Sequence, residues 1–333
     1  MTWAAPDTVE AAVGLLSRES GIAILAGGTD LVPRMKHGLI QPRGLLSLGR
    51  IGALRQIGPV KEGFRIGAGV TLTDLSAHPA VLETFPALAG AARRAASPQI
   101  RSIGTVGGNV LQEKRCFYYN QTRDWRRDIA PCLKLGGSIC YQVPSSGTCR
   151  ALYYSDLATV LVAFRAEAEL ADESGRRRVA LADLLRRRER GEGGERSLLT
   201  GLFLPFPIPG TRGIFLRWGV REAIDFPVAN AALCVSPGRP GPGSETMVRL
   251  VAGAFSPEPL RLKKTEELLA GCLLEAAGCL DALKAEALQE LRSRAGLIRE
   301  AVVSVKTKRS SFGIVGQVIE EFLQGGSVCC CGS

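Results

Sequence analysis

Four widely spaced cysteines between residues 116 and 149 restrict the fold of this chain more than any other sequence feature. They are Cys116, Cys132, Cys140 and Cys149, at spacings of 16, 8 and 9 positions. Zinc sites usually use close pairs of the form C-x2-C, and the sequence contains no such pair. Single cysteines on a glycine-containing loop can instead wrap a larger inorganic core, with backbone N–H groups bonding to its sulfides. The stretch therefore favours an iron–sulfur cluster over a zinc site or four unrelated cysteines.

The N-terminal sequence and the pattern of apolar residues predict where the protein resides and what the other cysteines do. The first ten residues lack the basic start and apolar run of a signal peptide, so we expect a cytoplasmic protein, in which disulfides are disfavoured. The most apolar stretch, residues 157–164, is too short to span a bilayer, so we expect no membrane insertion. Cys272 and Cys279 are predicted to fill the apolar face of one helix over residues 264–291. The three cysteines at 329–331 have no predicted role.

Charge and histidine content argue against several function classes. Much of the net charge of +10 comes from arginines between residues 176 and 190, which indicate a solvated helix end and loop or, alternatively, a docking surface for an acidic partner. No aromatic residue lies between residues 165 and 197, so we expect no nucleic-acid partner. The sequence has two histidines, so it does not favour zinc hydrolysis or catalysis by a Ser–His or Cys–His pair. It contains no G-x-x-x-x-G-K-[ST] motif, so it does not favour a P-loop nucleotide site.

Two glycine-rich turns suggest sites for phosphate groups. A strand predicted over residues 22–26 runs directly into G-G-T-D-L, and successive free N–H groups in such a turn form an anion nest. The second turn, T-V-G-G-N at residues 105–109, lies in a predicted irregular loop after a helix expected over residues 86–96. Its backbone can wrap a second phosphate. A simple tight turn is the alternative for the first motif, so the residues alone leave the ligand open.

Further motifs give these turns a context. Together with S-D-L-A at residues 155–158 and W-G-V-R-E-A-I-D-F-P-V-A-N-A-A at 218–232, they resemble the FAD-binding subunit of the molybdenum-hydroxylase family, which includes xanthine and carbon monoxide dehydrogenases. The resemblance implies that FAD lies on the two turns. The cofactor-binding residues that it implies are Leu25, Ala26, Gly27, Gly28, Thr29, Asp30, Leu31, Thr105, Val106, Gly107, Gly108, Asn109, Asp156 and Arg217. Many relatives have lysine at the position of Arg217.

The cysteines lie in an insertion relative to most of this family. Most members pass directly from the G-G-N turn to S-D-L, whereas this chain has about forty additional residues, at about 112–150. With R-C-F-Y-Y-N-Q-T and C-L-K-L-G-G, the insertion resembles the flavin subunit of the 4-hydroxybenzoyl-CoA reductase branch, in which an extra loop carries a [4Fe-4S] cluster. The resemblance implies Cys116, Cys132, Cys140 and Cys149 as cluster ligands. It implies no catalytic residue here, because the substrate reacts in another subunit.

The implied fold is α+β and has two domains and a tail. Residues 1–208 are expected to form a two-lobed FAD-binding domain of the vanillyl-alcohol oxidase (PCMH) type, with lobes 1–57 and 58–208. Residues 212–325 are expected to form a smaller α+β domain, like the C-terminal domain of carbon monoxide dehydrogenase flavoproteins, and 326–333 a flexible tail. A boundary rich in proline and glycine near residue 208 agrees with this division.

By resemblance, we expect an electron-transfer flavoprotein subunit that binds FAD and one [4Fe-4S] cluster. A large molybdopterin subunit and a small subunit with two [2Fe-2S] clusters would complete a dimer of heterotrimers, with ferredoxin as electron donor. The implied reaction converts 4-hydroxybenzoyl-CoA to benzoyl-CoA. One alternative is the FAD subunit of another molybdenum hydroxylase that acts on a different aromatic or heterocyclic substrate. Another is a zinc-stabilised flavin-fold binding module without a redox role.

Overall fold

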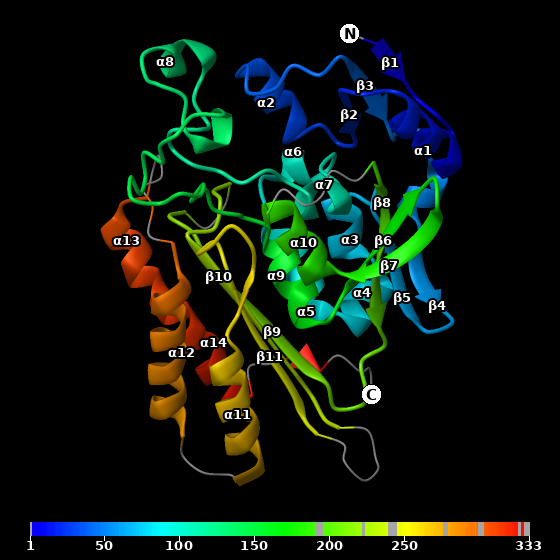
Figure 1. The fold of residues 1–333 in the computed structure, drawn as a ribbon. Helices are drawn as coiled ribbons and strands as arrows, with labels where there is room; N and C mark the ends of the chain where they lie inside the picture. Colours follow the sequence, from blue (N-terminus) through cyan, green and yellow to red (C-terminus); the bar gives the residue numbers. More distant parts are fainter. Residues whose placement is uncertain are drawn as a thin grey trace.

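In the part of the chain that the structure describes, three β-sheets follow one another and lie from the top right to the bottom of Figure 1. The computed structural model describes residues 2–190, 196–221, 224–238, 245–275, 279–296, 298, 303–325 and 328–329. Within these ranges, no helix has both the length and the apolar character needed to cross a membrane.

The first sheet is small and parallel. Its strands follow the order β1 (Thr2–Ala4), β3 (Gly44–Ser47) and β2 (Ile22–Leu25). Helix α1 (Val9–Arg18) connects β1 to β2, and α2 (Leu31–Lys36) lies on the connection from β2 to β3, because parallel strands need crossover connections. The strand predicted from the sequence is confirmed as β2. The G-G-T-D-L turn therefore leads from this strand into α2.

The second sheet is antiparallel, with the order β4 (Ile57–Val60), β5 (Gly63–Gly67), β8 (Leu198–Pro205), β6 (Glu167–Asp172) and β7 (Gly175–Ala180). Its helices are η1 (Gly52–Arg55), α3 (Leu72–Ala77), α4 (Pro79–Thr84), α5 (Pro86–Arg94), α6 (Pro98–Arg101), α7 (Val106–Val110), α9 (Asp156–Ala163) and α10 (Leu181–Arg190). The helix predicted after residue 86 is confirmed as α5. The expected irregular loop instead contains α6 and α7, because the side chains of Ser97 and Thr105 cap their first turns.

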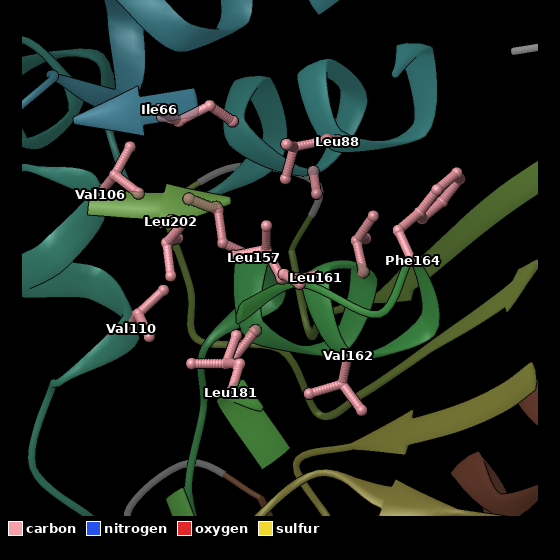
Figure 2. Close-up of a cluster of buried hydrophobic side chains, with 14 of the residues drawn as sticks. Ile66, Leu88, Val106, Val110, Leu157, Leu161, Val162, Phe164, Leu181 and Leu202 are labelled. Atoms are coloured by element: carbon pink, nitrogen blue, oxygen red, sulfur yellow. The ribbon is translucent and has the colours of Figure 1, made fainter. Parts of the chain in front are cut away.

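A large apolar core lies between the second sheet and its helices. Figure 2 shows Ile66 of β5 and Leu202 of β8 on one side of this core, with Leu88 of α5 and Leu157 of α9 facing them. Helix α9 is buried along its whole length, since it packs against α5 and also against two strands of the third sheet. This position places Asp156, the first residue of α9, inside the protein.

The third sheet is antiparallel, with the order β12 (Leu260–Arg261), β11 (Met247–Gly253), β10 (Ala229–Ser236), β9 (Arg212–Trp218) and β13 (Val328–Cys329). Its further helices are α11 (Lys263–Glu275), α12 (Leu280–Arg294), α13 (Val305–Ser310), η3 (Ser311–Gly313) and α14 (Ile314–Leu323). In Figure 1 these helices lie on the opposite side of the sheet from α5 and α9. Of the tail expected at 326–333, all but residues 328–329 falls outside the described residues.

The single helix predicted over residues 264–291 is wrong. Helix α11 ends at Glu275 and α12 begins at Leu280, so Cys272 and Cys279 do not share one continuous helical face. The two cysteines form a disulfide and pack against the core of the third sheet. Their predicted packing against the core is therefore confirmed, but they reach it from two elements, and the expectation that disulfides are disfavoured does not hold for this pair.

Residues 112–150, named here the cysteine segment, lie between α7 and α9 and are mostly irregular. Two short helices, α8 (Arg123–Arg127) and η2 (Leu133–Leu135), interrupt the segment, all of which the structure describes. Backbone groups of Arg115 and Leu152 exchange hydrogen bonds of 2.7 and 2.9 Å, which hold the two ends of the segment together. In Figure 1 the segment projects at the upper left, beside α2.

Candidate functional site

The first glycine turn presents free backbone donors. Within the described part of the chain, the N–H groups of Gly27, Gly28, Thr29 and Asp30 donate to no protein acceptor. Gly28 has a φ of +74°, in the left-handed region that glycine adopts without strain. Successive unpaired N–H groups in such a turn form a concave site for an anion. The turn therefore offers backbone donors for an anionic group.

Ile103 and Gly104, directly before the second turn, pack on the first turn. A Cβ atom placed on Gly27 would lie 1.9 Å from the Ile103 carbonyl oxygen, and one on Gly104 would lie 3.5 Å from the Thr29 hydroxyl oxygen. Glycine at position 27 therefore lets the two backbones touch. The structure brings together the two motifs that the sequence places about 75 residues apart.

Backbone N–H groups of the second turn donate hydrogen bonds to acceptors within the protein. The N–H groups of Val106 and Gly107 each donate 2.8 Å hydrogen bonds to carbonyl groups of the segment after β5, and that of Gly108 donates to the Thr105 hydroxyl. The Asn109 side-chain oxygen accepts a hydrogen bond of 2.6 Å from the Ser155 hydroxyl. These three N–H groups are therefore already bonded within the protein. A cofactor contact by residues 105–109 through other atoms stays a prediction.

Asp156 and Arg217 form a buried ion pair at the start of α9. The Arg217 Nε donates to the Asp156 carboxylate over 3.1 Å, and the side chains of Arg217 and Asp156 are 4% and 3% exposed. Asn230 on β10 donates to the other carboxylate oxygen over 2.6 Å, and Thr159 donates to the Asn230 side-chain oxygen over 2.9 Å. Burial raises the pKa of Asp156, while the Arg217 guanidinium and the Asn230 amide act in the opposite direction. Ser155, and not Asp156, caps α9.

The four cysteines of the cysteine segment line one cavity. Cys116, Cys132, Cys140 and Cys149 all border it, together with the aromatic side chains of Tyr118, Tyr119 and Tyr141. All four thiols are free. The cavity is small, with a volume of about 20 Å³. The fold thus brings together Cys116 and Cys149, which are 33 positions apart in the sequence.

A tight turn after η2 brings two of these cysteines together. Gly136 has a φ of +83°, and a Cβ on Gly137 would lie 1.6 Å from the Pro131 carbonyl oxygen. The chain consequently folds back, and Cys132 forms an isolated parallel bridge with Ile139, the neighbour of the third cysteine. Glycines at these two positions therefore shape the cavity.

Hydrogen-bond donors surround the Cys116 sulfur. The Gln142 side-chain amide donates to this sulfur over 3.6 Å, and the backbone N–H groups of Tyr118 and Tyr119 also point at it. Burial raises the pKa of the Cys116 thiol, and these donors act against burial because they favour the thiolate. In the described ranges, no group of three or more histidine, cysteine, aspartate or glutamate side chains is close enough to hold one metal ion.

A second pocket, which the sequence did not reveal, separates the cysteine segment from the β9–β10 connection. Its lining includes Arg115 and Cys116 of the segment together with Tyr154, Asp225 and Phe226. The Arg115 guanidinium carbon lies 4.3 Å from the Phe226 ring centroid, and the Phe226 and Tyr154 centroids are 5.7 Å apart. Of the five tyrosines between residues 118 and 154, only Tyr154 lines this pocket, so their clustering did not predict it.

Comparison with known proteins identifies the fold. Residues 1–207 match the family model described as the FAD binding domain in molybdopterin dehydrogenase. The aldehyde oxidoreductase FAD-binding subunit PaoB of Escherichia coli is 29% identical, over 76% of this chain and 80% of that protein. The carbon monoxide dehydrogenase medium chain of Hydrogenophaga pseudoflava is 41% identical, over 32% of this chain and 37% of that protein.

A solved structure extends the similarity to nearly the whole chain. The reconstituted CO dehydrogenase from Oligotropha carboxidovorans contains a chain that superposes with a TM-score of 0.71 at 21% identity, covering 96% of both chains. The mixed α/β architecture of an FAD-binding domain is therefore established for this sequence.

Proposed function

Because the chain belongs to the family of FAD-binding domains in molybdopterin dehydrogenases, we propose that it is an electron-transfer subunit carrying FAD and one [4Fe-4S] cluster. The family match makes it the FAD subunit of a molybdenum hydroxylase-type enzyme. The observation that carries the cluster proposal is the single cavity lined by all four cysteines of the cysteine segment. The redox chemistry would belong to the bound cofactors, and this chain would position them and tune their potentials.

The proposed FAD site combines the two glycine turns with the buried ion pair of Asp156 and Arg217. The N–H groups of Gly27 to Asp30 would hold the pyrophosphate, since they lack protein acceptors in the described chain. Residues 105–109 would border the cofactor with side chains and Cα atoms. Asp156 and Arg217 are buried against one another, so we propose that they support the flavin site from behind. The division into domains 1–208 and 212–325 belongs to the same proposal.

The proposed cluster site is supported by the chemistry of its donors. A [4Fe-4S] cluster takes four cysteine thiolates, and N–H groups directed at the sulfurs help to set its potential. Cys116 already receives such donors from Gln142 and two backbone groups. A single zinc ion would require four sulfurs at about 2.3 Å from one point. The described residues contain no such convergent group of three or more histidine, cysteine, aspartate or glutamate side chains.

Metal and flavin analysis of the full chain tests this proposal against zinc. The chain is purified anaerobically, and iron, acid-labile sulfide, zinc and flavin are measured per polypeptide. We expect about four irons and about four sulfides with one flavin. One zinc without iron would refute the cluster. In Cys132→Ser, the broad iron–sulfur absorbance should disappear while flavin still binds at saturating FAD, and full iron retention would exclude Cys132 as a ligand.

For the holoenzyme, we propose a large molybdopterin subunit, a small subunit with two [2Fe-2S] clusters and a reduced ferredoxin as electron donor. The substrate of that assembly would be 4-hydroxybenzoyl-CoA, whose phenolic hydroxyl would leave as water when two electrons from ferredoxin and two protons reduce it to benzoyl-CoA. Copurification with the partner chains, followed by anaerobic turnover of 4-hydroxybenzoyl-CoA, tests this assignment. Formation of benzoyl-CoA supports it. If the complex instead oxidises another aromatic or heterocyclic compound and leaves 4-hydroxybenzoyl-CoA unchanged, it is another molybdenum hydroxylase.

A further inference from the structure

A network of half-buried charges connects the first glycine turn to the cysteine segment. Asp30, at the end of the turn, accepts a hydrogen bond of 2.9 Å from Arg115 Nη2 and one of 3.3 Å from the Glu113 backbone N–H. Arg34 of α2 lies 3.7 Å from the other side of the same carboxylate. Arg115 directly precedes Cys116, the first cysteine of the cavity. One ion pair therefore links the turn to the residue next to the cavity.

A second branch of the network reaches another cysteine. Glu113 lies 3.5 Å from Arg34 and 2.8 Å from Lys134, which follows Cys132 by two positions. The Lys134 ammonium also lies 5.0 Å from the ring centroid of Tyr119, a residue that lines the cavity. Burial acts to raise the pKa of Glu113, but Lys134, the Lys114 backbone N–H and Arg34 outweigh it, so the pKa is lowered and the carboxylate stays charged.

The cysteine segment also holds the far end of α2. Arg126, in the last turn of α8, donates hydrogen bonds of 3.1 Å to the backbone carbonyls of both His37 and Gly38. Helix α2 begins immediately after the glycine turn, so the segment contacts it at Asp30 and again at its C-terminus. A change in the order of the segment is therefore transmitted to the turn at two places.

We propose that FAD binding at the first glycine turn and cluster assembly in the four-cysteine cavity are thermodynamically coupled through Arg115, which acts as a positioning residue. The proposal rests on the function proposed above. An Asp30 carboxylate beside a diphosphate is unfavourable unless its charge is compensated, because like charges repel strongly in a partly buried site. Arg34 of α2 supplies part of that compensation, and Arg115 adds to it only while the cysteine segment is ordered. A cluster bound by four cysteines would order the segment by tying together residues 116–149.

The coupling must be reciprocal. If the cluster tightens FAD binding by some factor, bound FAD stabilises the cluster by the same factor, since both share one thermodynamic cycle. Couplings between sites in proteins commonly lie between about 5-fold and about 150-fold. With one half-buried ion pair as the direct link, we expect a factor of about 10 in the dissociation constant of FAD.

A comparison of four forms of the full chain tests the coupling without measuring turnover. The dissociation constant of FAD is determined by flavin fluorescence for the wild type and for Arg115→Gln, each with its cluster and after cluster removal by a chelator and an oxidant. Removal should weaken FAD binding about 10-fold in the wild type and much less in Arg115→Gln, in which only the contacts of Glu113 with Asp30 and of Arg126 with α2 remain. Arg115→Lys, which keeps the charge, should recover part of the effect.

Arg127→Gln is the matched control, because Arg127 lies in the same segment, is 72% exposed and pairs with Asp124 on the surface. It should behave like the wild type. If iron is present and cluster removal leaves wild-type FAD affinity unchanged, the coupling is refuted while the proposed function stands. The coupling through Arg115 is equally refuted if Arg115→Gln folds, binds iron and keeps the full 10-fold effect. If the wild-type chain holds no iron at all, both proposals fail.

Discussion

Replacement of Arg217 by methionine leaves a buried carboxylate without its ionic partner. Asp156 is 3% exposed and the Arg217 side chain 4%, so water cannot take over the lost interaction. Removing one partner of a buried pair costs about 3–5 kcal/mol. Asn230 still donates a hydrogen bond of 2.6 Å to Asp156, so we expect the lower end of this range, a loss of about 3 kcal/mol in the free energy of unfolding near neutral pH.

The loss should depend on pH with a definite sign. Burial raises the pKa of Asp156 in the folded protein, and the variant also lacks the opposing Arg217 guanidinium, so its folded-state pKa is higher still. A raised folded-state pKa means that the folded protein binds the proton more tightly than the unfolded chain. The contribution of protonated Asp156 to stability is present at low pH and disappears as pH rises through the folded-state pKa of Asp156. Arg217→Met should therefore be less destabilising at about pH 5 than at about pH 8.

Urea unfolding followed by circular dichroism, at fixed flavin content, measures both effects. Arg217→Lys retains the charge and should lose less than the methionine variant. In the double variant Asp156→Asn with Arg217→Met, the losses should be far from additive, because the stranded charge is gone. A loss below about 1 kcal/mol for Arg217→Met at every pH would contradict the buried-pair argument.

Two glycine substitutions test the close contacts at the two cofactor sites. Gly27→Ala places a Cβ 1.9 Å from the Ile103 carbonyl oxygen, so the turns must separate, and FAD affinity measured by fluorescence should fall at least about 10-fold. Gly137→Ala places a Cβ 1.6 Å from the Pro131 carbonyl oxygen, and iron per chain should fall to below about half. Gly147→Ala meets no atom within 4 Å and serves as the control for both. Unchanged affinity or iron content would show that these contacts are not required.

Local sequence patterns predicted those elements whose determinants are local. The strand at β2 and the turn after it follow from an apolar run that ends in two glycines. The helix at α5 follows from its alanine-rich sequence. The apolar pattern in residues 264–291 continues across the break between α11 and α12, so a single helix was predicted there and two are present.

Features that depend on long-range pairing could not be predicted. Asn230 lies 74 positions from Asp156, and the motif by itself does not show that β10 delivers its amide to the start of α9. The N–H groups of Val106 and Gly107 bond to the segment after β5, a pairing that a glycine-rich motif does not encode. The role proposed for Arg115 likewise depends on its contact with Asp30, 85 positions earlier, which the sequence does not predict.

The cysteine spacing predicted a shared site, and the fold brings the four side chains to one cavity. What the spacing did not predict is how the cavity is supported. Gly136 and Gly137 fold the chain back on Cys132, and Gln142 donates to the sulfur of Cys116. The ligand assignment itself stays a prediction.

Anomalous diffraction at the iron absorption edge, from crystals of the anaerobically purified chain, would locate the proposed cluster directly. We expect one compact iron peak inside the cavity, surrounded by the sulfur atoms of Cys116, Cys132, Cys140 and Cys149, with FAD density over the Gly27–Asp30 turn. An absence of iron from this cavity in crystals that contain FAD, or a zinc signal in its place, would contradict the proposed cluster site.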